Sequence, residues 1–189
     1  MGENGKMDHN TKRFSGLAVA CCALITGLST ADARAETAPI AAYGHVAPVE
    51  NPANAPDPRL DYKVVMSVTK AGEAGAPPMA LEKAARLVNL LAVSGVPADH
   101  RHLVVILHGP ATFAVLNEAG SKAHGRPPNR SADLIANLTA AGVKVDVCGQ
   151  ALAGLKIGRD EVLPQVQVDL SALTTIATLQ LKGYALIPD

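Results

Sequence analysis

Apolar residues along the chain fall into two kinds of pattern, short continuous runs and runs with helical spacing. The continuous runs lie at 63–68, 103–107 and 143–147, and shorter ones follow at 166–170 and 184–187. A short, nearly continuous run of aliphatic residues is typical of a strand that is buried on both faces. We therefore expect five strands.

Helical spacing of apolar residues separates these runs. In the first such stretch Leu81, Ala84, Val88 and Leu91 share one helical face, and Gly95 ends the pattern. The predicted helices cover 79–94, 131–142, 150–156 and 171–183, with a short one near 113–116 and a polar loop at 120–128. Strands that alternate with helices predict a mainly parallel sheet with helices on both faces. In such sheets, sites gather outside the carboxyl ends of the strands.

The amino-terminal 35 residues fit a secretory signal peptide. Lys12 and Arg13 precede an uncharged apolar run, and Ala33-Arg34-Ala35 supplies small residues before a cut that would leave Glu36 first. The apolar run of about 15 residues is short for a membrane span, which needs about 20. We expect a periplasmic or secreted protein without a membrane span after cleavage. An uncleaved anchor and a lipid on Cys21 or Cys22 are the alternatives.

Composition indicates how the remaining chain is divided into a tether and a domain, and which functions are not expected. Residues 36–60 are rich in Pro and Ala and are expected to form a disordered tether, so the α/β domain is expected at 61–189. The sequence has 17 basic and 17 acidic residues, which gives no electrostatic reason for nucleic-acid binding. Tryptophan is absent, so the core must be aliphatic and base-stacking platforms are not expected.

The strongest chemical signal is a cysteine, Cys148, the only one left after removal of the signal peptide. It follows the third predicted strand and precedes a predicted helix, where backbone N–H groups favour a thiolate. His108 follows the second predicted strand, so both side chains are expected at one edge of the sheet. His108 is a candidate proton carrier, and Gln150 a candidate hydrogen-bond donor to a bound sulfur. The alternative for Cys148 is an inert core thiol.

These residues belong to three stretches in which the chain resembles the DsrE/DsrF-like family of sulfur-relay proteins. They are the strand end 105–111, the helix-to-strand unit 129–148, and the tail with Leu163-Pro164 and Gln180-Leu181-Lys182-Gly183-Tyr184. The resemblance implies a three-layer α/β/α fold with a five-stranded, mainly parallel sheet, and a homo-oligomer. It also implies that Cys148 carries sulfur as a persulfide between a donor and an acceptor. An exported, single-type branch of the family fits best.

Three hypotheses follow. The first is an exported carrier or transferase of sulfane sulfur that acts through Cys148, with no cofactor and no metal. The second is a non-catalytic oligomeric module that binds a small molecule or a partner and has an incidental cysteine. The third, a thiol–disulfide enzyme, lacks a second cysteine to resolve a mixed disulfide. A metal site formed by His100, His102, His108 or His124 lacks acidic or cysteine ligands at a helpful spacing.

Overall fold

The computed structural model describes residues 1, 37–73 and 76–189 of the chain. The predicted signal peptide and its cut before Glu36 lie outside the described residues, apart from Met1. No helix in the described part of the chain has the length and apolarity needed to cross a membrane.

The described residues form one sheet of five strands in the order β4-β3-β2-β1-β5, and every neighbouring pair is parallel. The strands are β1 (Tyr62–Val68), β2 (Arg101–Leu107), β3 (Lys144–Cys148), β4 (Gln167–Asp169) and β5 (Ala185–Pro188). All five coincide with predicted strands within one or two residues. The sheet confirms the predicted α/β class.

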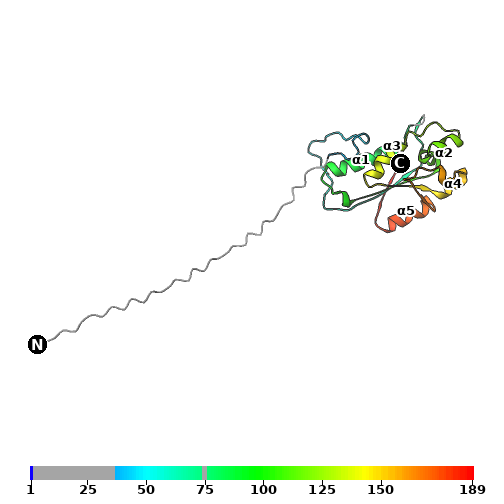
Figure 1. The fold of residues 1–189 in the computed structure, drawn as a ribbon. Coiled ribbons are helices and arrows are strands. Elements are labelled where there is room, and N and C mark those ends of the chain that lie inside the picture. Colours follow the sequence, from blue (N-terminus) through cyan, green and yellow to red (C-terminus); the bar gives the residue numbers. More distant parts are fainter. Residues whose placement is uncertain (2–36, 74–75) are drawn as a thin grey trace. The chain divides into compact units, whose positions relative to one another are not determined.

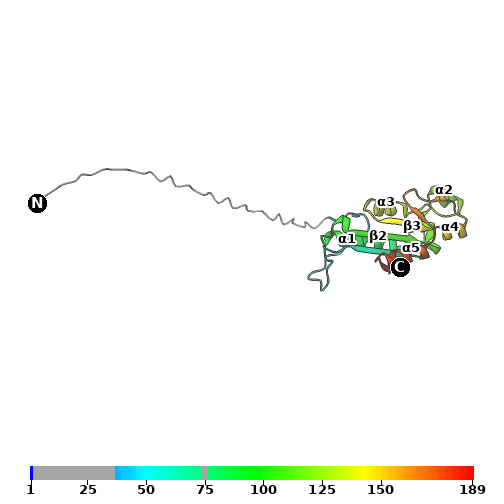
Figure 2. The ribbon, with the colours of Figure 1, turned by 90° about the horizontal axis from the view of Figure 1, so that it is seen from below.

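Helices cover both faces of the sheet, which completes the three-layer arrangement. The α-helices are α1 (Met79–Val93), α2 (Glu118–Ala123), α3 (Ala132–Ala140), α4 (Gly149–Leu155) and α5 (Ala172–Leu181). Short 3-10 helices are η2 (Ala98–His100), η3 (Gly109–Val115) and η4 (Arg159–Glu161). Figure 1 shows α1 and α3 on one side of the sheet and α5 on the other. Figure 2 shows α3 on one side of β2 and β3 and α5 on the other.

The two faces differ in how much apolar surface they bury. The face under α1 and α3 carries the larger core, with fully buried Leu81, Ile135 and Leu138 among its members. The face under α5 has a small core of Val65, Val104, Ile106, Cys148 and Ala172. Helix α5 itself buries only Ala172 of its own residues. Cys148 is therefore part of the thinner layer.

One predicted loop contains a helix. Residues 120–128 were expected to be irregular, but α2 begins at Glu118 because the Asn117 side chain accepts a hydrogen bond of 2.8 Å from the Gly120 backbone N–H. The segment has no apolar periodicity, so its helix depends on this cap rather than on a buried stripe. The short helix expected at 113–116 lies within η3, which is 3-10 rather than α.

The expected tether, 36–60, differs from the prediction in its first part. Ile40 is fully buried in the core under α1, although composition alone indicated a stretch that buries little apolar surface. The buried Asn89 of α1 holds this segment by its backbone: its Oδ1 accepts from Ile40 N–H at 3.0 Å, and its Nδ2 donates to the carbonyls of Ile40, Tyr43 and Gly44. The ordered domain thus includes this arm, residues 38–46, whereas residues 47–55 are exposed.

Replacing Asn89 should release the arm. Asn89→Ala leaves several buried backbone groups without partners, so the free energy of unfolding should fall by about 2–3 kcal/mol. Chemical denaturation measures the loss, and faster amide exchange at 40–44 locates it. Asn137→Ala is the matched control because its exposed amide bonds only within α3. Equal stability of the two variants would contradict the role of Asn89.

Candidate functional site

Cys148 ends β3 and directly precedes α4, as the sequence predicted. Its neighbour in β4 is Asp169. In β2, Leu107 pairs with Val147, so His108 comes one position later beside Cys148. Residues paired across parallel strands point to the same face of the sheet. The carboxyl ends of β2, β3 and β4 therefore bring His108, Cys148 and Asp169 together on the α5 face.

Backbone N–H groups determine the electrostatics of the Cys148 sulfur. Burial raises the pKa of the Cys148 thiol, but nearby N–H and O–H groups lower it by more, so that the pKa is lowered overall. The donors are the backbone N–H of Ala172, which is the largest of these contributions, those of Ala151 and Gln150, and the Ser171 hydroxyl. They belong to the first turns of α4 and α5, where unpaired N–H groups and the helix dipole favour negative charge. The sulfur thus lies between two helix amino termini.

Access to the sulfur is narrow. Cys148 is 6% exposed and packs against Val65, Val104 and Ile106. The reason is the approach of β4: a Cβ placed on Gly149 would lie 2.5 Å from the Asp169 carbonyl oxygen. Glycine at 149 is therefore required for the end of β4 to lie against the start of α4.

The side chains of Gln150 and His108 form hydrogen bonds other than those expected of them at the Cys148 sulfur. The Gln150 side chain is exposed and donates to the Leu170 carbonyl at 3.3 Å, so its contribution at the sulfur comes from its backbone N–H. The His108 Nε2 lies 2.9 Å from the Ser67 Oγ on β1, and the imidazole is thus turned away from β3. Gly109, with φ of +54°, makes the turn that follows. Both residues border the site, but neither side chain forms a hydrogen bond to the sulfur in the described part of the chain.

Two carboxyl groups on the same face were not predicted from the sequence. Asp146 lies two residues before Cys148 and is buried, and one of its oxygens has no hydrogen-bond partner among the described residues. Burial and the nearby Asp169 raise the pKa of Asp146 from its ordinary 3.8 to about 7, against a smaller opposing effect of Lys144. A carboxylate between two valines in the buried part of β3 was the signal for Asp146. That Asp169 lies near Asp146, and Ser171 near Cys148, follows from the pairing of β4 with β3. The strand order cannot be read from the sequence alone.

The other histidines lie away from this edge. His100 Nδ1 and His102 Nε2 are 3.9 and 3.7 Å from the Asp61 Oδ1, at the amino end of β2. His124 Nε2 is 3.2 Å from Glu161 Oε2. They do not gather with His108, and the described residues contain no cluster of three or more metal-ligating groups.

Fold and site together define a parallel α/β protein whose one cysteine in the described ranges lies at the carboxyl edge of the sheet, next to helix amino termini. The sequence profile of the DsrE/DsrF-like family matches residues 62–188, so the chain belongs to that family.

Solved structures show the same fold. A protein of unknown function, MTH1491 from Methanobacterium thermoautotrophicum, is similar with a TM-score of 0.52 and 21% identity over 68% of this chain and 100% of that one. The ychN protein from E. coli is similar with a TM-score of 0.51 and 18% identity over 68% and 99%. No curated protein matches the chain significantly.

The raised pKa of Asp146 predicts a pH-dependent loss of stability. The folded state binds this proton more tightly than the unfolded state, so its contribution is full below about pH 4 and is lost as the pH rises through about 7. Asp146→Asn removes that loss. The variant should exceed the parent protein in unfolding free energy by roughly 1–2 kcal/mol at about pH 8, after allowance for screening by solvent.

Denaturation at several pH values measures this difference, which should narrow steadily from about pH 8 to about pH 5. Asp99→Asn, at an exposed position of η2, is the control and should show no such trend. A difference that stays constant across the range would contradict the buried, proton-binding carboxyl.

Proposed function

We propose that the protein accepts sulfane sulfur as a persulfide on Cys148 and passes it to an acceptor. The observation that carries this proposal is the Cys148 sulfur between the amino termini of α4 and α5, where N–H groups lower its pKa. A nucleophilic thiolate is what a persulfide carrier needs. Membership of the DsrE/DsrF-like family supports a sulfur-relay role.

The transfer is a displacement at sulfur in both directions. The Cys148 thiolate attacks the terminal sulfur of a donor such as a polysulfide or thiosulfate, a new S–S bond forms, and the donor leaves with the electron pair of the broken bond. An acceptor thiolate or another nucleophile then attacks the outer sulfur and Cys148 leaves as a thiolate. No external oxidant is needed. Cys148 is a thiolate both when it attacks the donor and when it leaves the acceptor, so the N–H donors stabilise it in both steps.

His108 is assigned the movement of a proton. Its imidazole is half-exposed, hydrogen-bonds with Ser67 and lies beside the end of β3. Rotation from Ser67 toward β3 would direct it at an incoming donor. The protein is further proposed to be exported through its amino-terminal signal and to work in the periplasm or outside the cell, with donor and acceptor proteins or small sulfur compounds as partners.

Mass spectrometry tests the proposal directly. Mature protein beginning at Glu36 contains one cysteine, so incubation with polysulfide or thiosulfate should add mass in steps of one sulfur atom. Cys148→Ser should add none, and His108→Gln should add sulfur more slowly. Equal uptake by Cys148→Ser and the parent protein would reject the proposal.

The burial of Cys148 favours a second candidate, a binding module whose cysteine is incidental. The native alkylation rate separates the two. A carrier should react with iodoacetamide while folded, with a rate that follows the lowered thiol pKa. In the binding module, alkylation should require denaturant, and the folded protein should take up no sulfur.

The surface around α5 supports a homo-oligomer. Leu170, Leu173 and Leu181 are 75, 81 and 89% exposed, and Leu186 and Ile187 of the neighbouring β5 are also exposed. Exposed apolar clusters of this kind are typical of protein–protein interfaces. A second copy of this chain is the proposed occupant. It would complete the thin apolar layer on the α5 face and border the entrance to Cys148.

A charge at the centre of this surface should separate the copies. Leu173→Lys should lower the mass measured by size-exclusion chromatography with light scattering to that of one chain, because a buried unpaired charge is costly. Met79→Lys, on an exposed methionine of α1, is the control and should keep the oligomer. A parent protein that is monomeric at micromolar concentration would contradict the interface.

A further inference from the structure

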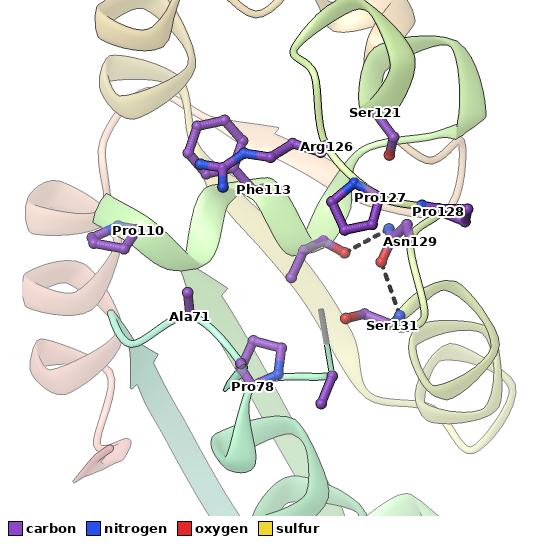
Figure 3. A pocket seen from close by; sticks show the side chains of 13 residues that line it. Ala71, Pro78, Pro110, Phe113, Ser121, Arg126, Pro127, Pro128, Asn129 and Ser131 are labelled. Atoms are coloured by element: carbon purple, nitrogen blue, oxygen red, sulfur yellow. Dashed lines mark hydrogen bonds between the residues drawn. The ribbon is translucent and has the colours of Figure 1, made fainter. Parts of the chain in front are cut away.

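A separate cavity of about 200 Å³ lies beside η3 and the loop between α2 and α3 (Figure 3). Phe113 and Ala114 of η3, Ser121 of α2, and the loop residues that lead to Ser131 form its wall. Phe113 and Ala114 pack against the core under α1 and α3, whereas Cys148 packs against the core under α5. Cys148 does not line this cavity, so it is not part of the site described above.

Among the described residues that line the cavity, one side chain, Arg126, is positively charged and none is negatively charged. The Arg126 guanidinium lies over the Phe113 ring, with its central carbon 3.6 Å from the ring centroid (Figure 3). The stacking orients the guanidinium and leaves its N–H groups available, because no described carboxylate pairs with Arg126. An uncompensated arginine beside an apolar wall favours an anionic group on a ligand.

Two nearly buried serines add hydrogen-bonding capacity. Ser121 and Ser131 are 3% and 2% exposed and line the cavity, and neither hydroxyl has a hydrogen-bond partner among the described residues. Figure 3 shows the Ser131 hydroxyl turned from the start of α3 toward the cavity. Both hydroxyls can therefore donate a hydrogen bond to a molecule in the cavity or accept one from it.

The wall is held in place before any ligand arrives. The Asn129 Nδ2 donates to the carbonyls of Ala114 and Leu116 at 2.9 and 2.7 Å, and its Oδ1 accepts from the Ser131 N–H at 2.8 Å (Figure 3). These bonds fasten the loop to η3. A rigid wall lowers the ordering cost of binding.

We infer that this cavity binds a small organic acid, with its anionic group at Arg126 and the serine hydroxyls and its apolar body against Phe113 and the prolines. Pro78, Pro110, Pro127 and Pro128 supply most of the apolar lining besides Phe113. The volume equals that of about seven water molecules, which suits a ligand of one ring. This binding is independent of sulfur transfer at Cys148.

Three probes test the inference on the isotopically labelled mature protein by NMR titration. Benzoate has both the charge and the apolar body, benzamide has the body alone, and sulfate has the charge alone. Benzoate should shift the amide signals of Phe113, Ser121, Asn129 and Ser131 in a saturable way and bind about tenfold more tightly than either other probe, as a charge-assisted contact predicts.

Arg126→Gln should reduce benzoate affinity to that of benzamide. The matched control, Arg130→Gln, changes an exposed arginine that does not line the cavity and should bind as the parent does. Equal affinity for benzoate and benzamide, unchanged binding by Arg126→Gln, or no saturable shift would overturn the inference. Cys148→Ser should bind benzoate normally, and loss of binding there would overturn its independence from the sulfur site.

Discussion

The close contact between the end of β4 and Gly149 is the constraint on which the candidate site depends. Because residue 149 has no side chain, the Asp169 carbonyl can approach the first turn of α4. That approach brings the loop after β4, and with it the amino terminus of α5, over Cys148. N–H groups at the starts of two helices, rather than one, then lower the pKa of the Cys148 thiol. A side chain at 149 would separate β4 from α4 and leave the α5 donors out of reach.

The same geometry explains why the Cys148 thiol has a lowered pKa although it is buried. The main donors that lower the Cys148 pKa are neutral backbone N–H groups, so they remain in place whatever the protonation of the surrounding side chains. A histidine-paired thiolate would depend on the charge of its partner. In this protein His108 bonds to Ser67 instead, so its imidazole does not stabilise the sulfur in this structure, and the proton movement proposed for it would be a separate role.

Much of the fold followed from the sequence, because its signals are local. The strands have continuous aliphatic runs, the helices have periodic ones, and their alternation specifies a parallel sheet whose carboxyl ends hold Cys148 and His108. Strand order is not local, and the residues that depend on it were missed. Asp169 and Ser171 reach Cys148 only because β4 pairs with β3. Ile40 was missed for another reason: its proline-rich context indicated a tether, whereas Asn89, 49 residues later, supplies the backbone partners that dock it.

The unequal layers of the sheet place the Cys148 thiol on the face where a second copy of the chain is proposed to bind. A helix that covers a sheet normally buries one apolar stripe, but α5 buries only Ala172 and exposes leucines near both ends. The α5 face also holds Asp146 and Asp169, each with a buried oxygen that has no partner among the described residues. Two features are expected where a further surface packs against a fold. One is an incomplete apolar layer, and the other is a set of polar atoms without hydrogen-bond partners. Since both occur on the face that holds Cys148, a second copy on α5 would change the burial of the sulfur and the proton affinity of Asp146 together.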